Sequence, residues 1–225
     1  MDLLWFMLAV LLFAGAAATL LARPGILLQS LPVAGLIAAL VWQNRPNRLG
    51  PADRITLLRA AGVAALAGLP FQVELADATL WTAAAIAGLL LLMDGVDGVV
   101  ARRTGTSSGF GARFDMELDA FFILVLCLLV WQGGEVGPWV LLIGLLRYLF
   151  VAAGLLLPAL VEPLPDSLRR KIACVIQVVA LLLSLAPLTT ARQAEIIALT
   201  ALLLLIYSFA VDTRWLLRTG TGRKS

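Results

Sequence analysis

Apolar stretches of membrane length recur along the whole chain, and they limit its fold more than any other feature. Roughly 20 residues rising 1.5 Å each cross a hydrocarbon core of about 30 Å. We count eight such stretches in a chain that is 61% hydrophobic and only 14% charged. Inside a bilayer, a helix satisfies its own backbone hydrogen bonds. The sequence therefore predicts an all-α, polytopic membrane helix bundle, with helices at residues 3–21, 26–42, 55–69, 80–102, 112–131, 139–157, 167–185 and 194–217.

The spacing of these stretches divides the chain into three segments. The first two predicted helices are joined by the short turn Arg23-Pro24-Gly25 and form an additional transmembrane hairpin, residues 1–43. A polar linker with two prolines follows at residues 44–54, on the cytoplasmic side or at the interface, and the other six helices form one membrane domain, residues 55–225. The residues before the first apolar stretch carry no positive charge, which favours a retained helix over a cleaved signal peptide.

Basic residues are distributed unevenly between the two sides of the predicted bundle. With a cytoplasmic amino terminus, 14 Lys and Arg residues lie in inside segments, and only Arg23 and Arg192 lie outside. Positive loops stay in the cytoplasm, so both chain ends and the basic segments are predicted to face it. We expect an integral protein of a bacterial cytoplasmic membrane. Its net charge of +3 is explained by membrane topology and by contact with anionic headgroups, and not by nucleic-acid binding.

Two residue types limit the available chemistry. Histidine is absent, which excludes His-ligated zinc or haem and removes the commonest general base. The two cysteines, Cys127 and Cys174, fall inside apolar segments, so neither a disulfide framework nor a cysteine metal site is indicated. Acid–base chemistry must therefore come from carboxylates, Lys, Tyr or Cys.

Four aspartates, Asp94, Asp97, Asp115 and Asp119, lie within 26 residues between apolar stretches. An ionised carboxylate in hydrocarbon costs several kcal/mol, so such a group needs a polar cavity and a partner of opposite charge. Residues three or four apart share a helix face, and only a short turn at residues 103–110 separates the two helices. We expect the four carboxylates to converge near the cytoplasmic ends. Oxygen ligands without His or Cys suit Mg²⁺ or Mn²⁺, and four are enough for two ions, which can assist displacement at phosphorus.

The residues around the aspartates carry a family resemblance. With Gly98, Ala101, Arg102 and Gly111 at fixed gaps, the run resembles the class I CDP-alcohol phosphotransferase signature, Asp-x-x-Asp-Gly-x-x-Ala-Arg-x8-Gly-x-x-x-Asp-x-x-x-Asp, and all eight fixed positions are filled. The resemblance extends from about residue 51 to the end. It implies a six-helix catalytic core in residues 55–225, to which the two N-terminal helices are additional.

The resemblance also implies an activity, a transferase of phospholipid synthesis. Asp94, Asp97, Asp115 and Asp119 would hold two divalent cations at the pyrophosphate of a CDP-linked substrate, and Asp119 would also act as the base. The nucleotide site would comprise Gly98, Ala101, Arg102 and Gly111. An acceptor hydroxyl would attack the phosphorus distal to cytidine and CMP would leave. A homodimer is implied by the resemblance alone.

Five further polar residues are candidates for binding the acceptor or a phosphate. Thr56 and Arg59 lie in a segment similar to the Pro-Asn-x-Leu-Thr-x-x-Arg pattern of many members, with Ala52-Asp53 and Ile55 as departures. Arg147 lies in mid-helix, where a guanidinium needs a carboxylate or phosphate. Arg170 and Lys171 begin a degraded Gly-Lys-x-Lys-Thr-x-x-Gln pattern. The rival interpretations are interfacial anchoring for Thr56 and Arg59, a structural ion pair for Arg147, and headgroup contact for Arg170 and Lys171.

The expected reaction moves a phosphatidyl group from CDP-diacylglycerol to a small polar alcohol, with or without a phosphate of its own. The basic residues are the ground for considering an anionic acceptor. The same motif serves enzymes that use a CDP-linked polar headgroup and a lipid alcohol, so it leaves the direction open. Three rivals remain: a membrane cation transporter, a catalytically silent member with a partner, and an intramembrane prenyltransferase, whose aspartates are spaced differently.

Overall fold

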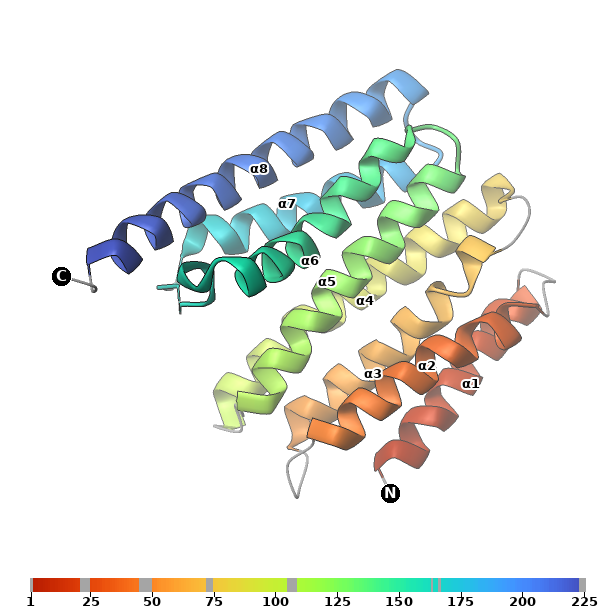
Figure 1. The fold of residues 1–225 in the computed structure, drawn as a ribbon. Coiled ribbons are helices and arrows are strands. Elements are labelled where there is room, and N and C mark those ends of the chain that lie inside the picture. Colours follow the sequence, from red (N-terminus) through yellow and green to blue (C-terminus); the bar gives the residue numbers. More distant parts are fainter. Residues whose placement is uncertain are drawn as a thin grey trace. The chain divides into compact units, whose positions relative to one another are not determined.

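The chain is built from helices (Figure 1). The structure, a computed structural model, describes residues 2–20, 25–44, 50–71, 75–104, 109–162, 164–165 and 167–222. Within these residues there are eight α-helices and three short 3₁₀ segments, which confirms the predicted all-α class. The α-helices are α1 Asp2–Leu20, α2 Gly25–Asn44, α3 Pro51–Leu66, α4 Asp77–Thr104, α5 Gly109–Gln132, α6 Leu141–Leu156, α7 Leu168–Leu185 and α8 Ala191–Gly222. The 3₁₀ segments are η1 Leu69–Phe71, η2 Pro138–Val140 and η3 Pro158–Val161.

Five segments in the described part of the chain are long and apolar enough to cross a membrane. They are Gly25–Gln43, Pro51–Phe71, Asp77–Val96, Pro138–Leu156 and Ala191–Arg218. The apolar part of α1 is shorter, Leu4–Thr19. Both α5 and α7 carry charged residues in their N-terminal halves, which shortens their apolar length. The protein is therefore an integral membrane protein, although not all eight predicted helices are apolar over a full span.

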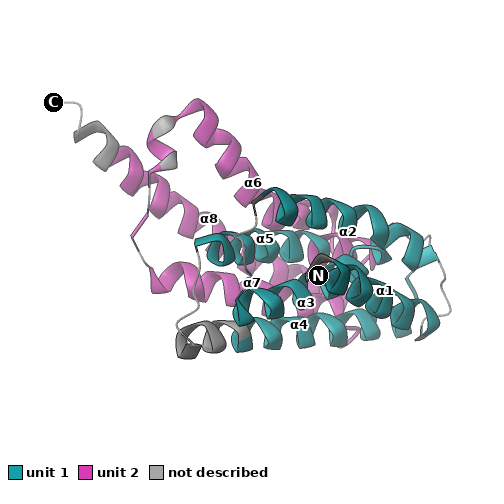
Figure 2. Ribbon diagram, turned by 90° about the horizontal axis from the view of Figure 1, so that it is seen from below, with its two compact units in different colours: residues 1–125 teal, residues 126–225 magenta. Residues whose placement is uncertain are grey.

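The chain divides into two compact units, Met1–Val125 and Leu126–Ser225, and the division falls within α5 (Figure 2). In unit 1, α3 packs against α1, α2 and α4, so the N-terminal hairpin shares a unit with the helix that carries the first aspartates. In unit 2, α7 packs along α8, and η3 lies against α6 and α8. The boundaries at residues 43 and 54 stay a prediction.

Helix α3 begins at Pro51 rather than at residue 55, where the apolar pattern placed it. Proline suits the first helical position because its missing N–H would have no partner there. The Asp53 carboxylate accepts a hydrogen bond of 2.8 Å from the N–H of Gly50, the residue that caps the start of the helix. These two local signals extend the helix by one turn into the segment predicted as linker.

Helix α3 is also the most enclosed part of unit 1, because twelve of its 16 residues are buried. Small residues allow neighbouring helices to approach closely. A Cβ added at Gly62 would lie 2.5 Å from Leu90 Cδ2 of α4, and one at Gly68 would lie 2.9 Å from the Ile26 carbonyl oxygen of α2. The end of α3 and the residues after it are therefore packed closely against α4 and α2, whereas Arg54 near its start is exposed.

Candidate active site

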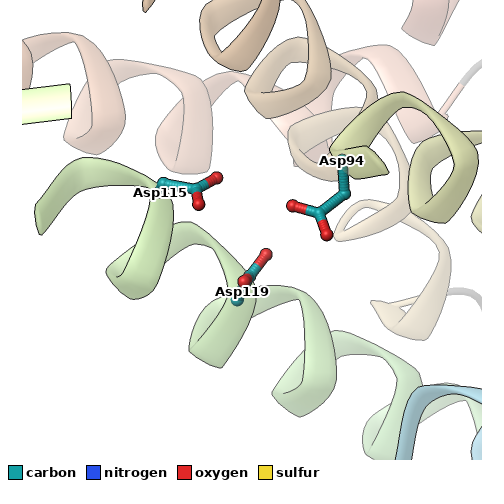
Figure 3. Close-up of side chains that lie close together, drawn as sticks. All are labelled: Asp94, Asp115 and Asp119. Atoms are coloured by element: carbon teal, nitrogen blue, oxygen red, sulfur yellow. The ribbon is translucent and has the colours of Figure 1, made fainter. Parts of the chain in front are cut away.

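The candidate site lies in unit 1, where the last turns of α4 face the first turns of α5. Asp94 comes from α4, and Asp115 and Asp119 come from α5, one turn apart. One carboxylate oxygen of each residue lies within 4.8 Å of those of the other two. Figure 3 shows the Asp94 carboxylate directed toward the two from α5. The predicted convergence therefore holds for these three residues.

A buried arginine lies among the carboxylates. The side chain of Arg59, from α3, is only 2% exposed, and its Nη1 donates to Asp94 Oδ1. Its Nη2 lies 2.6 Å from Asp119 Oδ1, to which it donates, and 2.9 Å from Asp115 Oδ1. A guanidinium presents several N–H groups in a rigid plane, so a single side chain can contact all three acids. Three helices thus meet at one ion-pair network.

The charge balance of this network favours a cation. Among the contacts described for this cluster, one guanidinium faces three carboxylates, whose side chains are 32–38% exposed. Buried or partly buried negative charges repel one another unless a cation lies between them. Carboxylate oxygens are the ligands that hard divalent cations prefer. The residues therefore fit a divalent metal, with Arg59 supplying part of the positive charge.

Of the remaining motif residues, the structure describes the surroundings of one, Gly111. Gly111 lies half-buried in the first turn of α5. Asp97, Gly98, Ala101 and Arg102 belong to the last turns of α4, but their side chains lie outside the described residues. Their predicted roles in metal and nucleotide binding stay predictions.

Thr56 and Arg59 share a face of α3, since they are three residues apart. The Thr56 hydroxyl is buried and donates a hydrogen bond of 3.1 Å to the Ala52 carbonyl of the preceding turn. Arg59 was predicted to face substrate phosphates, and in the structure it contacts the acids themselves. Its place at the centre of the cluster was not foreseen, although a lone arginine among small apolar residues was a signal for a buried ion pair.

The other basic candidates belong to unit 2. Arg147 is half-buried in α6, and Lys171 is exposed in the first turn of α7. Arg170 donates from Nη2 to the Pro165 carbonyl, and its Nη1 lies 3.7 Å from Asp212 Oδ1 of α8. An acceptor or phosphate role for these three residues stays a prediction.

A second ion-pair cluster in unit 2 was missed in the sequence. Arg169 of α7 pairs with Asp212 and also donates to the Ser208 carbonyl and hydroxyl, the latter at 3.0 Å. Asp212 is buried, with only 8% exposure. A single aspartate inside the apolar run of α8, set opposite a basic turn, was the signal that could have revealed it.

Comparison with known proteins identifies the family. Residues 50–209 match the model of the CDP-alcohol phosphatidyltransferase family, whose members use divalent metals. The match begins at the start of α3 and leaves α1 and α2 outside. No curated protein and no solved structure matched the chain. The chain belongs to the CDP-alcohol phosphatidyltransferase family.

Proposed function

We propose that the protein transfers a phosphatidyl group from CDP-diacylglycerol to a small polar alcohol, with or without a phosphate group, and releases CMP. Family membership establishes phosphatidyl transfer in general, with a CDP-alcohol and an alcohol acceptor as the substrate classes. The observation that carries the proposal is the convergence of Asp94, Asp115 and Asp119 on one point at the motif positions. A membrane setting suits a donor whose two acyl chains remain in the leaflet.

The metal would be Mg²⁺ or Mn²⁺, in two ions held by Asp94, Asp97, Asp115 and Asp119. When bound, the ions would neutralise the pyrophosphate and the charge that develops on the attacking and leaving oxygens. Arg59 adds a fixed positive charge on the protein side, where it holds the carboxylates together before substrate arrives. The small residues Gly98, Ala101 and Gly111, together with Arg102, would accept the CMP part.

Asp119 would act as the base. The acceptor hydroxyl gives its proton to the Asp119 carboxylate, and its oxygen forms a bond to the phosphorus distal to cytidine. The bond between that phosphorus and the bridging oxygen breaks, and the electron pair leaves with CMP. A positioned carboxylate typically contributes about 10²–10⁴-fold to such a proton transfer. Thr56, Arg59, Arg147, Arg170 and Lys171 are proposed to bind the acceptor or a phosphate.

The basic segments support a site and both termini on the cytoplasmic side, from which a water-soluble acceptor would enter. The homodimer stays a proposal from family resemblance. A cation transporter would need its carboxylates in helices broken to line a pathway, whereas Asp94 and Asp115 lie in uninterrupted α-helices. Family membership likewise favours a transferase.

The test is CMP release by purified protein in detergent or liposomes. CDP-diacylglycerol is supplied with Mg²⁺ or Mn²⁺ and each of glycerol 3-phosphate, inositol, inositol phosphate and serine. Asp119→Asn should lower the rate of release by about 10²-fold or more. Glu117→Gln, which removes an exposed acid two residues away on the same helix, should leave the rate unchanged. Release with CDP-choline and diacylglycerol instead would establish the alternative direction. Silence with both donor classes from a folded protein would refute the transferase proposal.

A further inference from the structure

A groove lies between α1 and α3 in unit 1, on a part of the molecule that is independent of the carboxylate cluster. Its volume is about 500 Å³, within the range of roughly 300–1,000 Å³ that is typical of ligand pockets. Trp5, Leu8 and Leu12 of α1 form one wall, and Leu57 and Leu58 of α3 form the other. Because α1 lies outside the family match, this groove is particular to a chain with the N-terminal hairpin.

Among the described residues that line the groove, one is charged. This residue, Arg54 of α3, is exposed, and the other described lining residues are apolar. Helices α1 and α3 begin at the same end of unit 1 (Figure 1), so Trp5 and Arg54 both lie about one turn from that end. Tryptophan and arginine are the side chains that favour the headgroup level of a bilayer, and arginine binds phosphate through two parallel N–H groups.

Beyond this polar end, the groove continues as an apolar channel. From Trp5 to Leu12 the wall of α1 extends seven residues, about 10 Å at 1.5 Å per residue. Trp5, Leu8 and Leu12 are 65%, 45% and 65% exposed, so the channel is open along its side to the bilayer. Leu57 is buried and closes the floor. This combination of a cationic end and an open apolar channel matches a phosphate headgroup followed by an acyl chain.

The groove and the carboxylate cluster lie on different faces of α3. At 3.6 residues per turn, Arg54, Leu57 and Leu58 lie within one sector of α3 of about 100°, and Arg59 lies outside that sector. Arg59 points instead to Asp94 and Asp119. A lipid in the groove would therefore contact the back of the helix whose front holds the carboxylates, and it would not place its phosphate at the reacting centre.

We propose that this groove holds one resident anionic phospholipid of the bilayer, with its phosphate on Arg54 and one acyl chain between α1 and α3. A second copy of the chain fits less well. A helix of that copy, about 10 Å across, would contact the groove over only about two turns. An anionic headgroup is favoured over a zwitterionic one because each basic residue near the surface contributes ~1 kcal/mol to anionic lipid binding, about a five-fold preference.

Trp5 provides the readout, since a bromine atom on an acyl chain quenches a tryptophan that it contacts. Full-length protein is placed in vesicles that contain brominated phosphatidylglycerol or brominated phosphatidylcholine over the same series of mole fractions. The difference in quenching between wild type and Trp5→Phe isolates Trp5 from the other tryptophans. We expect half-maximal Trp5 quenching at about five-fold less phosphatidylglycerol than phosphatidylcholine. Equal quenching by the two lipids would overturn the proposal and mean ordinary bilayer contact.

Two sets of variants locate the effect, one at the charged residue and one in the channel. Arg54→Gln should abolish the preference and Arg54→Lys should keep most of it, while Arg214→Gln, which removes an exposed arginine of α8, should leave it unchanged. Ala9→Phe should fill the channel and reduce Trp5 quenching, and Ala16→Phe, on an exposed position of α1 outside the groove, should not. A preference that survives Arg54→Gln would overturn the phosphate assignment.

Competition distinguishes a resident lipid from the donor. Unbrominated CDP-diacylglycerol is added at the same mole fraction as unbrominated phosphatidylglycerol. We expect CDP-diacylglycerol to relieve Trp5 quenching no more than phosphatidylglycerol does. Stronger relief by the CDP-lipid would assign the groove to the donor and overturn the resident-lipid proposal. Because the readout is fluorescence, its result does not depend on whether the transferase activity is found.

Discussion

Arg59 and Asp119 are joined by a hydrogen bond of 2.6 Å between Nη2 and Oδ1, although sixty residues separate them in the sequence. The same guanidinium contacts Asp94 and Asp115, so α3, α4 and α5 are connected through one side chain. The position that a divalent cation would neutralise is therefore already partly neutralised by the protein. Arg59 is both a structural connection and a source of charge at the site.

Replacement of Arg59 should make the fold of unit 1 depend on divalent cations. In Arg59→Met, three carboxylates keep their mutual repulsion and lose their counter-ion. Breaking a buried ion pair costs about 3–5 kcal/mol, and because these acids are about one-third exposed we expect about 2–3 kcal/mol. The midpoint of thermal unfolding in EDTA should fall, and added Mg²⁺ should raise it more in the variant than in wild type.

The conservative variant Arg59→Lys is the matched control for this prediction. A lysine retains the charge but cannot present parallel N–H groups to three acids. Its unfolding midpoint in EDTA should lie between those of wild type and Arg59→Met. Equal midpoints for all three proteins in EDTA would contradict the role of Arg59 as counter-ion.

Variants of the three aspartates should differ in how their activity depends on Mg²⁺ concentration. Asp94→Asn and Asp115→Asn remove one ligand each, so CMP release should need a higher Mg²⁺ concentration and should recover in part at saturation. Asp119→Asn removes a ligand and the base together, so kcat should fall by about 10²-fold or more even at saturating Mg²⁺. The measurement is kcat against Mg²⁺ concentration for each variant. Full recovery of Asp119→Asn at high Mg²⁺ would exclude it as the base.

Much of the site follows from local sequence, because spacing and turn length decide it. Asp115 and Asp119 are four residues apart on one helix, and a short connection returns the chain beside Asp94, so their convergence could be predicted. The contribution of Arg59 could not, because it depends on how α3 packs against helices 35 and 60 residues away. From the sequence, Arg59 was a candidate for binding the acceptor or a phosphate, with interfacial anchoring as the rival, and its carboxylate partners were not identified.

The packing role of small residues also could not be predicted from the sequence. A Cβ added at Gly95 of α4 would meet nothing within 4 Å, whereas one at Gly62 or Gly68 would collide with a neighbouring helix. Glycines look alike in a sequence, and only the packed helices distinguish them. The start of α3 is different, since Pro51 followed by Asp53 is a local signal that could have placed it correctly.

Two glycine variants test the packing of unit 1. Gly68→Ala places a Cβ 2.9 Å from the Ile26 carbonyl oxygen, a backbone atom that cannot rotate away. Overpacking of this kind typically costs about 1–3 kcal/mol, so the thermal unfolding midpoint should fall. Gly88→Ala is the matched control within α4, because its Cβ would meet nothing within 4 Å. Alanine favours a helix over glycine by roughly 0.5–1 kcal/mol, so this variant should be unchanged or more stable. A lower midpoint for Gly88→Ala than for Gly68→Ala would contradict the packing described.

The basic residues in the first turn of α7 should have two different roles. Arg169 and Arg170 should stabilise the fold, and Lys171 should bind substrate. Asp212 is buried and pairs with Arg169 and Arg170, so Asp212→Asn leaves two guanidinium groups without their carboxylate. We expect a loss of about 3 kcal/mol in stability, near the lower end for a broken buried pair. Lys171 is exposed, so Lys171→Gln should leave the unfolding midpoint within about 0.5 kcal/mol of wild type.

Kinetics with two acceptors then decides whether Lys171 binds a phosphate. If the acceptor carries a phosphate that Lys171 contacts, Lys171→Gln should raise KM for glycerol 3-phosphate or inositol phosphate about ten-fold, as loss of a charge-assisted hydrogen bond would. KM for an unphosphorylated acceptor such as inositol or serine should stay the same, and so should kcat with both. Arg192→Gln, on the predicted opposite side of the membrane, is the control for a general change in surface charge. An equal rise in KM for both acceptor classes would assign Lys171 to lipid headgroups, because only contact with the acceptor's own phosphate can distinguish the two.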